Sequence, residues 1–482
     1  MFHPAIQFEK LFMAKTKIEQ TVQLIQDQIH NKSLLVGSRL PSVRQLATQL
    51  NFSISTVVEA YSRLVAEGIL ESRLGSGYYV LGQITEIANI EPVLNVQREI
   101  DPLWISRQAL DAKADVFKPG CGWLPSDWMP EASIRKALKQ TAKSDVFLLT
   151  DYAPAQGHLA LRKWIVRRKE IYNLQLQLNQ ILVTDSATQS IDLIFRHLLQ
   201  AGDVILIDDP CYFNFRALIK AHGLKAVAIP FTQHGPDLEK FEQALSLKPK
   251  IYLTNSGIHN PTGATISLQT VYQISKLAEK HHFKIIEDEI FADFEYSPAP
   301  RYASLAGLQH VIQIGSFTKT LTASVRCGYI VSDAQCIDEL IDLRIATNFS
   351  SSQLNAEIIY QVLIDSTYLK HMDYIKKKLL RTMQEVIQKL AKLEIVPCSI
   401  PHAGIFLWCK LPCDIEASAL SKRCLKQGLI LAPGNSFSQA EHAGSFMRFN
   451  VAQCVDQKVF DVLALAMSEL RINHRIPHNP IR

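Results

Sequence analysis

The sequence predicts an α/β protein in two parts, a small helical module at the N-terminus and a large domain with a mostly parallel sheet. Two observations lead to this prediction. Within residues 18–80, three short helical patterns precede two short strand-like pieces. From about residue 114 onward, short apolar runs alternate with longer amphipathic stretches, which is typical of a parallel sheet covered by helices. The length of 482 residues has room for both parts.

Composition excludes several classes of protein. Hydrophobic residues make up 47% and charged residues 20% of the chain, which excludes a mainly disordered protein and a coiled coil. The net charge of +5 neither requires nor excludes nucleic acid. No apolar run reaches the roughly 18 residues of a membrane helix, and no signal peptide is expected. The nine cysteines are scattered without a CxxC motif, so we expect reduced thiols, no metal site and a cytoplasmic protein.

The three helices of the N-terminal module each have a recognisable start or face. Isoleucine and valine recur at helical spacing over residues 18–29 and predict the first helix. Ser42 and Gln45 form an S-x-x-Q capping box that starts a second helix over residues 43–50. Ser53 is a favourable N-cap for the third helix. The short link between the last two helices is typical of a helix-turn-helix.

A hairpin completes this module and suggests a DNA-binding role. Strand-like pieces at residues 69–72 and 78–80 are joined by a glycine-rich turn, which gives the outline of a winged helix-turn-helix. Hydroxyl groups, guanidinium groups and close backbone approach could contact DNA. The candidates are Arg39, Ser42, Arg44, Ser53, Ser55, Thr56 and Gly77. The alternative is a protein-contact domain. Residues 1–80 hold eight basic side chains against six acidic ones, and this small excess of positive charge gives only weak support for DNA binding.

The module resembles the DNA-binding domain of the GntR family over residues 37–80. Its matching motifs are Leu40-Pro41-Ser42-x-Arg44, Ser53-x-x-Thr56-Val57, Ala60-Tyr61 and Gly75-x-Gly77. The resemblance implies that Arg44 and Thr56 contact double-stranded operator DNA. The family usually has Arg where this chain has Ile54, so the operator sequence can differ. We assign residues 10–81 to this domain.

The rest of the chain divides into a linker and a large domain. Residues 82–114 lack sustained periodicity and are predicted as an interdomain linker, partly helical over 104–112. Residues 115–475 form the large domain, and residues 331–475 are predicted to be mainly a smaller C-terminal subdomain. The expected strands are 181–184, 204–207, 226–229, 251–253, 284–286, 311–314 and 327–331, with helices that include 190–199 and 268–280.

Several loops after these strands carry reactive or polar side chains, and ligands of parallel sheets bind at such strand ends. Lys319 could be a Schiff-base amine or a surface lysine. Asp288 could pair with a cation or cap the next helix, and Asn260 could face a ligand or only form a turn. Ser186-Ala187-Thr188 could bind phosphate at a helix N-terminus or serve only as a cap. Each fragment alone leaves both interpretations open.

Taken together, the fragments resemble fold-type I aminotransferases, which use pyridoxal 5′-phosphate (PLP). They follow one another in the order of that family over residues 115–475. The matching motifs are Tyr152-x-x-x-x-Gly157, Ser186-Ala187-Thr188, Asp209-Pro210-x-Tyr212, Asn260-Pro261-Thr262-Gly263, Asp288, Ser316-x-x-Lys319, Arg326-x-Gly328, Pro433-Gly434-x-x-Phe437 and Arg448-Phe449-Asn450.

This resemblance implies a role for each matched position. Lys319 would form the internal aldimine with PLP, Asp288 would pair with the pyridine nitrogen, and Asn260 would bond the ring oxygen O3′. Tyr212 would stack on the ring, and Arg448 would bind a substrate α-carboxylate. The phosphate would be held by Ala187, Thr188, Ser316 and Arg326, with Tyr152 reaching it from the neighbouring subunit.

Two positions depart from the family pattern. Phe291 stands where the family often has a tyrosine that donates to O3′, and losing that hydrogen bond costs about 0.5–1.5 kcal/mol of cofactor binding. We therefore expect weak or absent multiple-turnover transamination. Asn214 stands where some regulators of this type have an arginine for a second carboxylate, so a dicarboxylate or γ-amino-acid effector bound in that way is not expected.

A GntR-like winged helix joined to an aminotransferase-like domain is the arrangement of the MocR subfamily of bacterial transcription regulators. The resemblance implies a PLP-dependent, DNA-binding regulator that senses a small amino compound through aldimine formation. It further implies a homodimer whose large domains associate head to tail. The alternative function is a working PLP-dependent aminotransferase, acting on an amino acid and a 2-oxo acid, with an accessory DNA-binding head.

Overall fold

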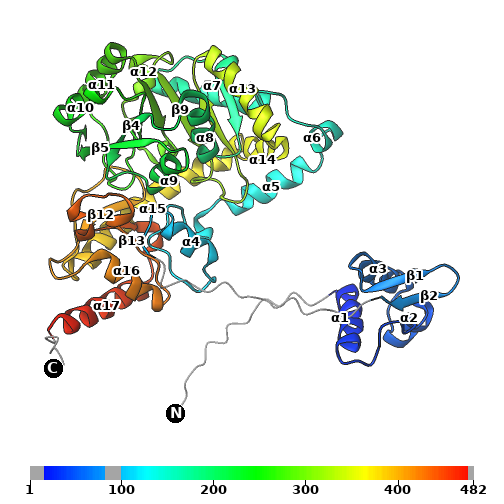
Figure 1. The fold of residues 1–482 in the computed structure, drawn as a ribbon. Coiled ribbons are helices and arrows are strands. Elements are labelled where there is room, and N and C mark those ends of the chain that lie inside the picture. The colour runs from blue at the N-terminus through cyan, green and yellow to red at the C-terminus, as the bar shows by residue number, and fades with distance from the viewer. Residues whose placement is uncertain (1–15, 82–98, 476–482) are drawn as a thin grey trace. The chain divides into compact units, whose positions relative to one another are not determined.

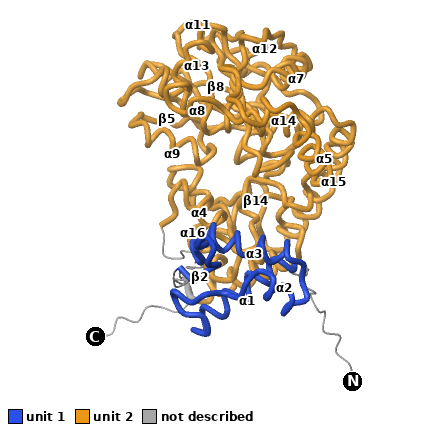
Figure 2. Tube along the Cα trace, turned by 90° about the vertical axis from the view of Figure 1, so that its right-hand side faces the viewer, with its two compact units in different colours: residues 1–91 blue, residues 92–482 orange. Residues whose placement is uncertain are grey.

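The computed structural model describes residues 16–81 and 99–475 (Figure 1). The expectations for residues 10–15 and for the linker residues 82–98 lie outside the described residues. The chain forms two compact units, residues 1–91 and residues 92–482 (Figure 2).

The smaller unit contains three helices followed by an antiparallel hairpin, which confirms the predicted winged helix-turn-helix. Its elements are α1 (Lys17–His30), α2 (Val43–Leu50), α3 (Ile54–Ala66), β1 (Leu70–Arg73) and β2 (Gly77–Val80). The capping box of Ser42 and Gln45 is formed in full at the start of α2. The side chain of Ser53 accepts a hydrogen bond from the Thr56 amide at the start of α3. The hydroxyl of Tyr61 donates to the carbonyl of Pro41 at 2.8 Å and ties α3 to the segment before α2.

The larger unit is built on an eight-stranded sheet in the order β3-β10-β9-β8-β7-β4-β5-β6. Its strands are β3 (Ile181–Thr184), β4 (Val204–Asp209), β5 (Lys225–Thr232), β6 (Gly235–Pro236), β7 (Ile251–Thr254), β8 (Lys284–Asp288), β9 (Val311–Ser316) and β10 (Gly328–Val331). The central run β9-β8-β7-β4-β5 is parallel, whereas β10 is antiparallel to both of its neighbours. The mostly parallel sheet that the apolar runs predict is therefore confirmed.

Helices cover both faces of this sheet (Figure 1). Ile205 and Ile207 of β4 pack with one set of helices, and Leu206 packs with the other set. The first set is α8 (Ala187–Leu198), α9 (Phe213–Ala221) and α13 (Ala334–Asn348), and the second includes α7 (Leu159–Lys169), α10 (Leu238–Ala244), α11 (Leu268–His281) and α12 (Tyr302–Ala306). Because helices cover both faces of the sheet, most side chains of its central strands are buried, and this explains why these strands are almost continuously apolar in sequence.

The C-terminal part has a second sheet in the order β11-β12-β14-β13. Its elements are β11 (Val396–Pro397), β12 (Phe406–Lys410), β13 (Ala432–Pro433), β14 (Phe446–Asn450), α15 (Ser366–Ala391), α16 (Ala417–Lys426) and α17 (Gln457–Arg475). Two helices inside the range predicted as mainly small subdomain belong elsewhere. Ile337 and Leu340 of α13 lie in the core of the large sheet, and α14 (Gln353–Leu363) packs against α5 (Glu131–Thr141) and α7.

Part of the predicted linker is built into the larger unit. Helix α4 (Trp104–Asp111) lies within residues 82–114 and buries Trp104 and Ile105 in a cluster with Trp408 of the C-terminal sheet. Its short length gave only a weak helical pattern. Over the described residues, no helix combines the length and apolar character that crossing a membrane requires. The same residues contain no cluster of three or more metal-ligating side chains.

Candidate cofactor site and nucleic-acid interface

The sheet topology places the predicted reactive side chains near one another at the carboxyl ends of adjacent strands. Asp288 is the last residue of β8, and Lys319 lies in the segment after β9. Asn260 follows β7, and Tyr212 follows β4 and is the N-cap of α9. Residues that are far apart in the sequence therefore converge because parallel strands end at the same edge.

Lys319 is a half-buried lysine without an ion-pair partner among the described residues. Its Nζ donates to the carbonyl of Gly122 at 2.7 Å and lies 5.7 Å from the centre of the Phe291 ring. Burial lowers the pKa of Lys319 to about 8, the charge of Arg448 acts in the same direction, and Asp288 opposes it. A neutral, nucleophilic amine is therefore far more populated near pH 7 than for an ordinary lysine.

Asp288 is a buried carboxyl group whose charge is poorly compensated. Burial raises the pKa of Asp288 to about 6, although the Ile290 amide and the positive charge of Lys319 oppose this effect. Its Oδ1 accepts a hydrogen bond from the Ile290 amide at 3.1 Å. A cation placed beside Asp288 would favour the ionised carboxylate.

Arg448 on β14 is a buried cation whose hydrogen bonds are incomplete. Its Nη1 donates to Oδ1 of Asn260 at 2.7 Å, and its Nη2 donates to the carbonyl of Gly120 at 2.6 Å. The carbon of the guanidinium lies 4.3 Å from the centre of the Phe406 ring and 4.7 Å from that of Phe437. Its Nε has no partner, and no carboxylate forms an ion pair with it among the described residues. Burial lowers the pKa of Arg448 to about 10. An anion beside it would offset the cost of this buried charge.

A segment that the motif analysis missed completes the site. The main-chain carbonyls of Gly120, Cys121 and Gly122 accept hydrogen bonds from the side chains of Arg448, Asn450 and Lys319. A Cβ on Gly120 would lie 2.4 Å from the carbonyl carbon of Leu431, so glycine is needed for this close approach. In the sequence, only the two closely spaced glycines of Pro119-Gly120-Cys121-Gly122 indicated that the backbone approaches other groups closely here.

The predicted phosphate ligands surround the start of α8. Ser186 caps this helix by accepting from the Gln189 amide at 3.1 Å. A Cβ on Gly328 would lie 2.6 Å from the Ser186 carbonyl carbon, so this glycine lets the strand after Arg326 approach the helix N-terminus. Burial raises the pKa of Tyr212 to about 12, while the charges of Arg448 and Arg326 oppose the shift. Tyr212 thus lies within electrostatic reach of both guanidinium groups.

The hydroxyls of this region are bonded within the chain. Ser316 Oγ donates to the carbonyl of Cys327 at 2.9 Å and lies 2.9 Å from Thr318 Oγ1. Thr188 Oγ1 accepts from the Asn214 amide group at 3.4 Å. The roles of Ala187, Thr188, Ser316 and Arg326 as phosphate ligands stay predictions.

Comparison with known proteins assigns both units. Residues 126–464 match the family described as "Aminotransferase class I and II". The chain belongs to this family. Residues 17–80 match the "Bacterial regulatory proteins, gntR family", so an aminotransferase domain follows a GntR domain.

Similar proteins carry both parts or only the larger one. The "Uncharacterized HTH-type transcriptional regulator YdfD" of Bacillus subtilis is 25% identical over 458 residues, covering 92% of this chain and 94% of the relative. The "HTH-type transcriptional regulator NorG" of Staphylococcus aureus is 27% identical over 418 residues, covering 84% of this chain and 93% of the relative. The domain pair and these relatives agree with the MocR subfamily that the motifs predicted.

Solved aminotransferases share the fold of the larger unit. The α-aminoadipate aminotransferase LysN of Thermus thermophilus has a TM-score of 0.69 at 19% identity and covers 78% of this chain and 96% of its own. The kynurenine aminotransferase of Pyrococcus horikoshii has a TM-score of 0.69 at 19% identity and covers 81% of this chain and 100% of its own. PLP is the cofactor implied by the family and by these structures.

Tyr152 of the aminotransferase domain points away from the chain's own interior. Its side chain is 74% exposed, and its ring lies 4.6 Å from that of Phe349. Tyr152, Asp185 and Arg326 line one open hollow of about 580 Å³. Neighbouring large apolar side chains are also exposed, namely Val146, Phe147, Leu149, Phe349 and Leu354.

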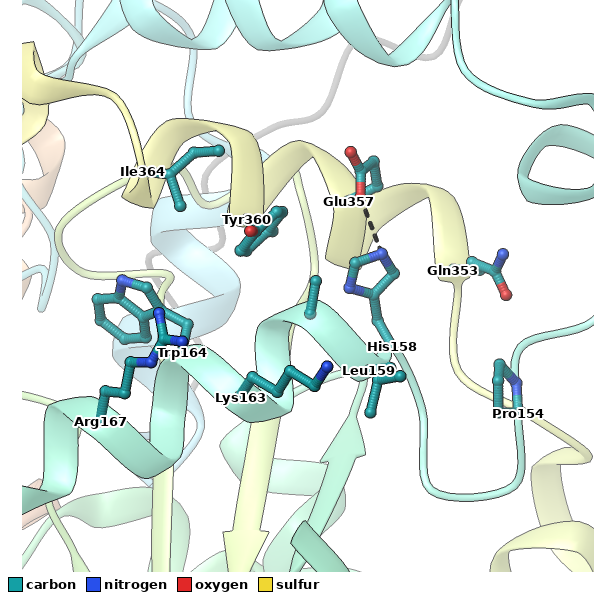
Figure 3. Close-up of a pocket in the computed structure, with 11 residues that line it drawn as sticks. Pro154, His158, Leu159, Lys163, Trp164, Arg167, Gln353, Glu357, Tyr360 and Ile364 are labelled. Atoms are coloured by element: carbon teal, nitrogen blue, oxygen red, sulfur yellow. Dashed lines mark ion pairs between the residues drawn. The ribbon is translucent and has the colours of Figure 1, made fainter.

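A separate cavity of about 520 Å³ lies between α7 and α14 of the aminotransferase domain (Figure 3). His158 Nε2 lies 2.8 Å from Glu357 Oε2, and its Nδ1 accepts from the Leu161 amide at 3.2 Å. Burial lowers the pKa of His158, although Glu357 opposes this effect. Both ring nitrogens are engaged, so this pair holds the start of α7 in place. None of the predicted site residues lines this cavity.

In the GntR domain, the predicted DNA-contacting residues are exposed except for Thr56 and Gly77, which are half-buried. Ser53 Oγ lies 2.9 Å from Ser55 Oγ and 2.7 Å from Thr56 Oγ1, so these hydroxyls form one cluster at the start of α3. Gly77 has a φ of +109°, which favours glycine, and a Cβ there would lie 3.5 Å from Arg39 Nε.

The four arginines of the GntR domain differ in their pairing. Arg63 forms an ion pair with Glu59 at 3.0 Å, and Arg73 pairs with Glu71. Arg39 and Arg44 form no ion pair with any described residue. Two of the predicted DNA contacts are therefore exposed cations whose charge remains available to phosphate.

Proposed function

We propose that the protein is a PLP-dependent transcription regulator whose aminotransferase domain binds an amino compound and whose GntR domain binds operator DNA. The observation that carries the proposal is a pair of cations, the half-buried Lys319 and the fully buried Arg448, that lack carboxylate partners within the described residues. They occur in one chain with a winged helix-turn-helix. This pairing of parts fits a sensor coupled to a DNA-binding head.

The donor set fits PLP, whose phosphate and whose amino-acid partner both bring negative charge. Asp288 would hold the protonated ring nitrogen, Asn260 the O3′ oxygen and Tyr212 the ring face. Ala187, Thr188, Ser316 and Arg326 would hold the phosphate, together with Tyr152 of a second subunit. When bound, PLP withdraws electrons from the α-carbon of an amino compound.

The residues of the chain would divide the remaining work. Lys319, neutral in an appreciable fraction of molecules because of its lowered pKa, would supply the amine that holds the cofactor and would accept or return a proton. Arg448 would bind the α-carboxylate, with Asn260 and Gly120 holding its two Nη atoms in place. A regulator results only if the amino compound binds one arrangement of the protein more tightly than another.

A working aminotransferase with an accessory DNA-binding head is the second candidate function. The lysine, carboxylate and arginine set is complete, and the similar structures are aminotransferases. Phe291 argues against efficient turnover, since its buried ring offers no hydrogen-bond donor to O3′. Multiple-turnover kinetics distinguish the two functions.

We further propose a homodimer in which the aminotransferase domains associate head to tail. The exposed apolar side chains around Tyr152 support this assembly, because such a cluster is costly to leave in water. Tyr152 would then reach the cofactor phosphate of the partner subunit. Since the GntR domain must reach chromosomal DNA, we propose that the protein acts in the cytoplasm.

The test uses purified full-length protein and a Lys319→Ala variant. The parent protein should be yellow, and borohydride treatment followed by peptide mapping should place the pyridoxyl group on Lys319. The variant should lose this labelling and the response to amino compounds, yet retain DNA binding. Lys276→Ala, which removes an exposed lysine paired with Glu279, is the matched control and should behave as the parent. A colourless parent protein whose spectrum ignores added PLP would refute the proposal.

A further inference from the structure

An apolar strip lies on the exposed side of helix α3 in the GntR domain. Ile54 and Val58 are 53% and 42% exposed, whereas Val57 and Tyr61 of the same helix are completely buried. Ile54 and Val58 are four residues apart, so their side chains lie on one face of the helix, one turn from each other. Neither is required by the domain's own core.

Hydroxyl groups flank this strip, and the same domain carries unpaired cations. The hydroxyls of Ser53, Ser55 and Thr56 flank Ile54 in the sequence and form a single cluster. The same domain presents Arg39 and Arg44, which are without ion-pair partners in the part of the chain that the structure describes. An apolar strip flanked by hydroxyls, in a domain with two unneutralised arginines, is suited to a polyanion that also exposes apolar groups.

We propose that Ile54 is a specificity-determining residue that contacts the 5-methyl group of a thymine in the major groove, with Val58 extending the contact one turn further. The inference rests on the proposed DNA-binding function, with the start of α3 entering the groove. The thymine methyl is an apolar group at the major-groove edge, and aliphatic side chains contact it. An isoleucine has no donor for the O6 and N7 acceptors of guanine, so Ile54 favours thymine over guanine at the base it faces.

The experiment combines protein and DNA changes in a double-mutant cycle. Full-length protein first selects duplexes from a random pool, and each thymine of the selected site is then replaced by deoxyuridine, which lacks only the methyl group. Affinities of parent and Ile54→Ala protein are measured by fluorescence anisotropy at one salt concentration.

One thymine in each half-site should couple to Ile54. Replacing it should weaken the parent about fourfold, which corresponds to the roughly 0.8 kcal/mol of one buried methylene group. The same replacement should not weaken Ile54→Ala any further. Leu35→Ala, which truncates another exposed apolar side chain of the domain, should keep the full fourfold effect. Ile54→Arg should change the selected base from thymine to guanine.

The outcomes separate this inference from the function on which it rests. If no duplex is enriched and the protein does not bind DNA, the DNA-binding function is wrong and the inference falls with it. If the protein binds a selected site but no thymine couples to Ile54, the inference alone is overturned. It is also overturned if Ile54→Ala changes the mass of the assembly in light scattering without altering the deoxyuridine effect, because the strip is then a protein interface.

Discussion

In the aminotransferase domain, Nη1 of Arg448 donates a hydrogen bond of 2.7 Å to Oδ1 of Asn260, a residue 188 positions earlier in the chain. One side chain comes from β14 and the other from the loop after β7. The contact fixes part of a buried guanidinium whose Nε has no partner in the described part of the chain. Asn260 thereby positions the cation that we propose as the carboxylate ligand.

Arg448→Met should weaken recognition of the carboxylate while leaving room for the amine. We expect the apparent affinity for responsive amino acids to fall at least about tenfold, because charge-assisted hydrogen bonds contribute roughly 1.5–3 kcal/mol each. The decarboxylated amine of the same amino acid should bind both proteins alike. Titrations followed by the visible spectrum measure both affinities. Equal losses for the amino acid and its amine would show that Arg448 does not bind the carboxylate.

The capture of PLP by the cofactor-free protein should depend on pH through Lys319. Because the pKa of Lys319 is lowered to about 8, the neutral amine should increase about tenfold per pH unit below pH 8 and level off above it. We expect the rate of cofactor capture, measured by stopped-flow absorbance between pH 6 and 10, to follow this profile. A rate that keeps rising to pH 10 would show an ordinary lysine.

The same profile should move in Arg448→Met. The positive charge of Arg448 lowers the pKa of Lys319, so removing it should shift the plateau to higher pH. Burial is the larger cause and remains, so the plateau should stay below the pH expected for an exposed lysine. A shift to lower pH would contradict this account of the site's electrostatics.

Phe291→Tyr should strengthen cofactor binding and test why turnover is expected to be slow. Phe291 is 2% exposed, and its ring lies 5.2 Å from that of Phe406 beside the site. A hydroxyl that reaches O3′ should tighten PLP by about two- to tenfold, equivalent to about 0.5–1.5 kcal/mol. Equilibrium titration measures this change.

Transamination by the parent should be far below about 10 per second, a median enzyme value. Parent turnover near that value, without DNA binding, would favour the enzyme function.

Arg44→Ala should weaken operator binding, whereas Arg63→Ala should have little effect. Arg44 is exposed without an ion-pair partner among described residues, and Arg63 is neutralised by Glu59 at 3.0 Å. We expect Arg44→Ala to cost about 1–3 kcal/mol if it contacts a base, or to lower the salt slope by about 1 if it contacts phosphate. Anisotropy titrations at several salt concentrations measure both. The colour should be unchanged. Equal effects of the two substitutions would contradict the proposed docking.

Local features of the sequence predicted the elements well. Ser42 with Gln45 and Ser53 mark helix starts because their side chains satisfy free backbone amides within three residues. The strand over residues 181–184 was predicted with its observed bounds because it is buried on both faces and three of its four residues are apolar. Lys319 and Asp288 could be singled out because parallel strands place such loops at one edge of a sheet.

Long-range relationships were decided only by the tertiary structure. A helical period does not tell which surface a helix covers, so α13 was expected in the smaller subdomain although it packs on the large sheet. Likewise, no local pattern shows that Gly120 lies beside Arg448, 328 residues away. The sequence by itself predicted which residues would carry the chemistry, and it marked the helix starts that Ser42 and Ser53 cap. The folded chain alone decided that Arg448 is buried with no counter-ion from residues 16–81 or 99–475. The charge balance of a site depends on which distant side chains the topology brings within a few ångströms.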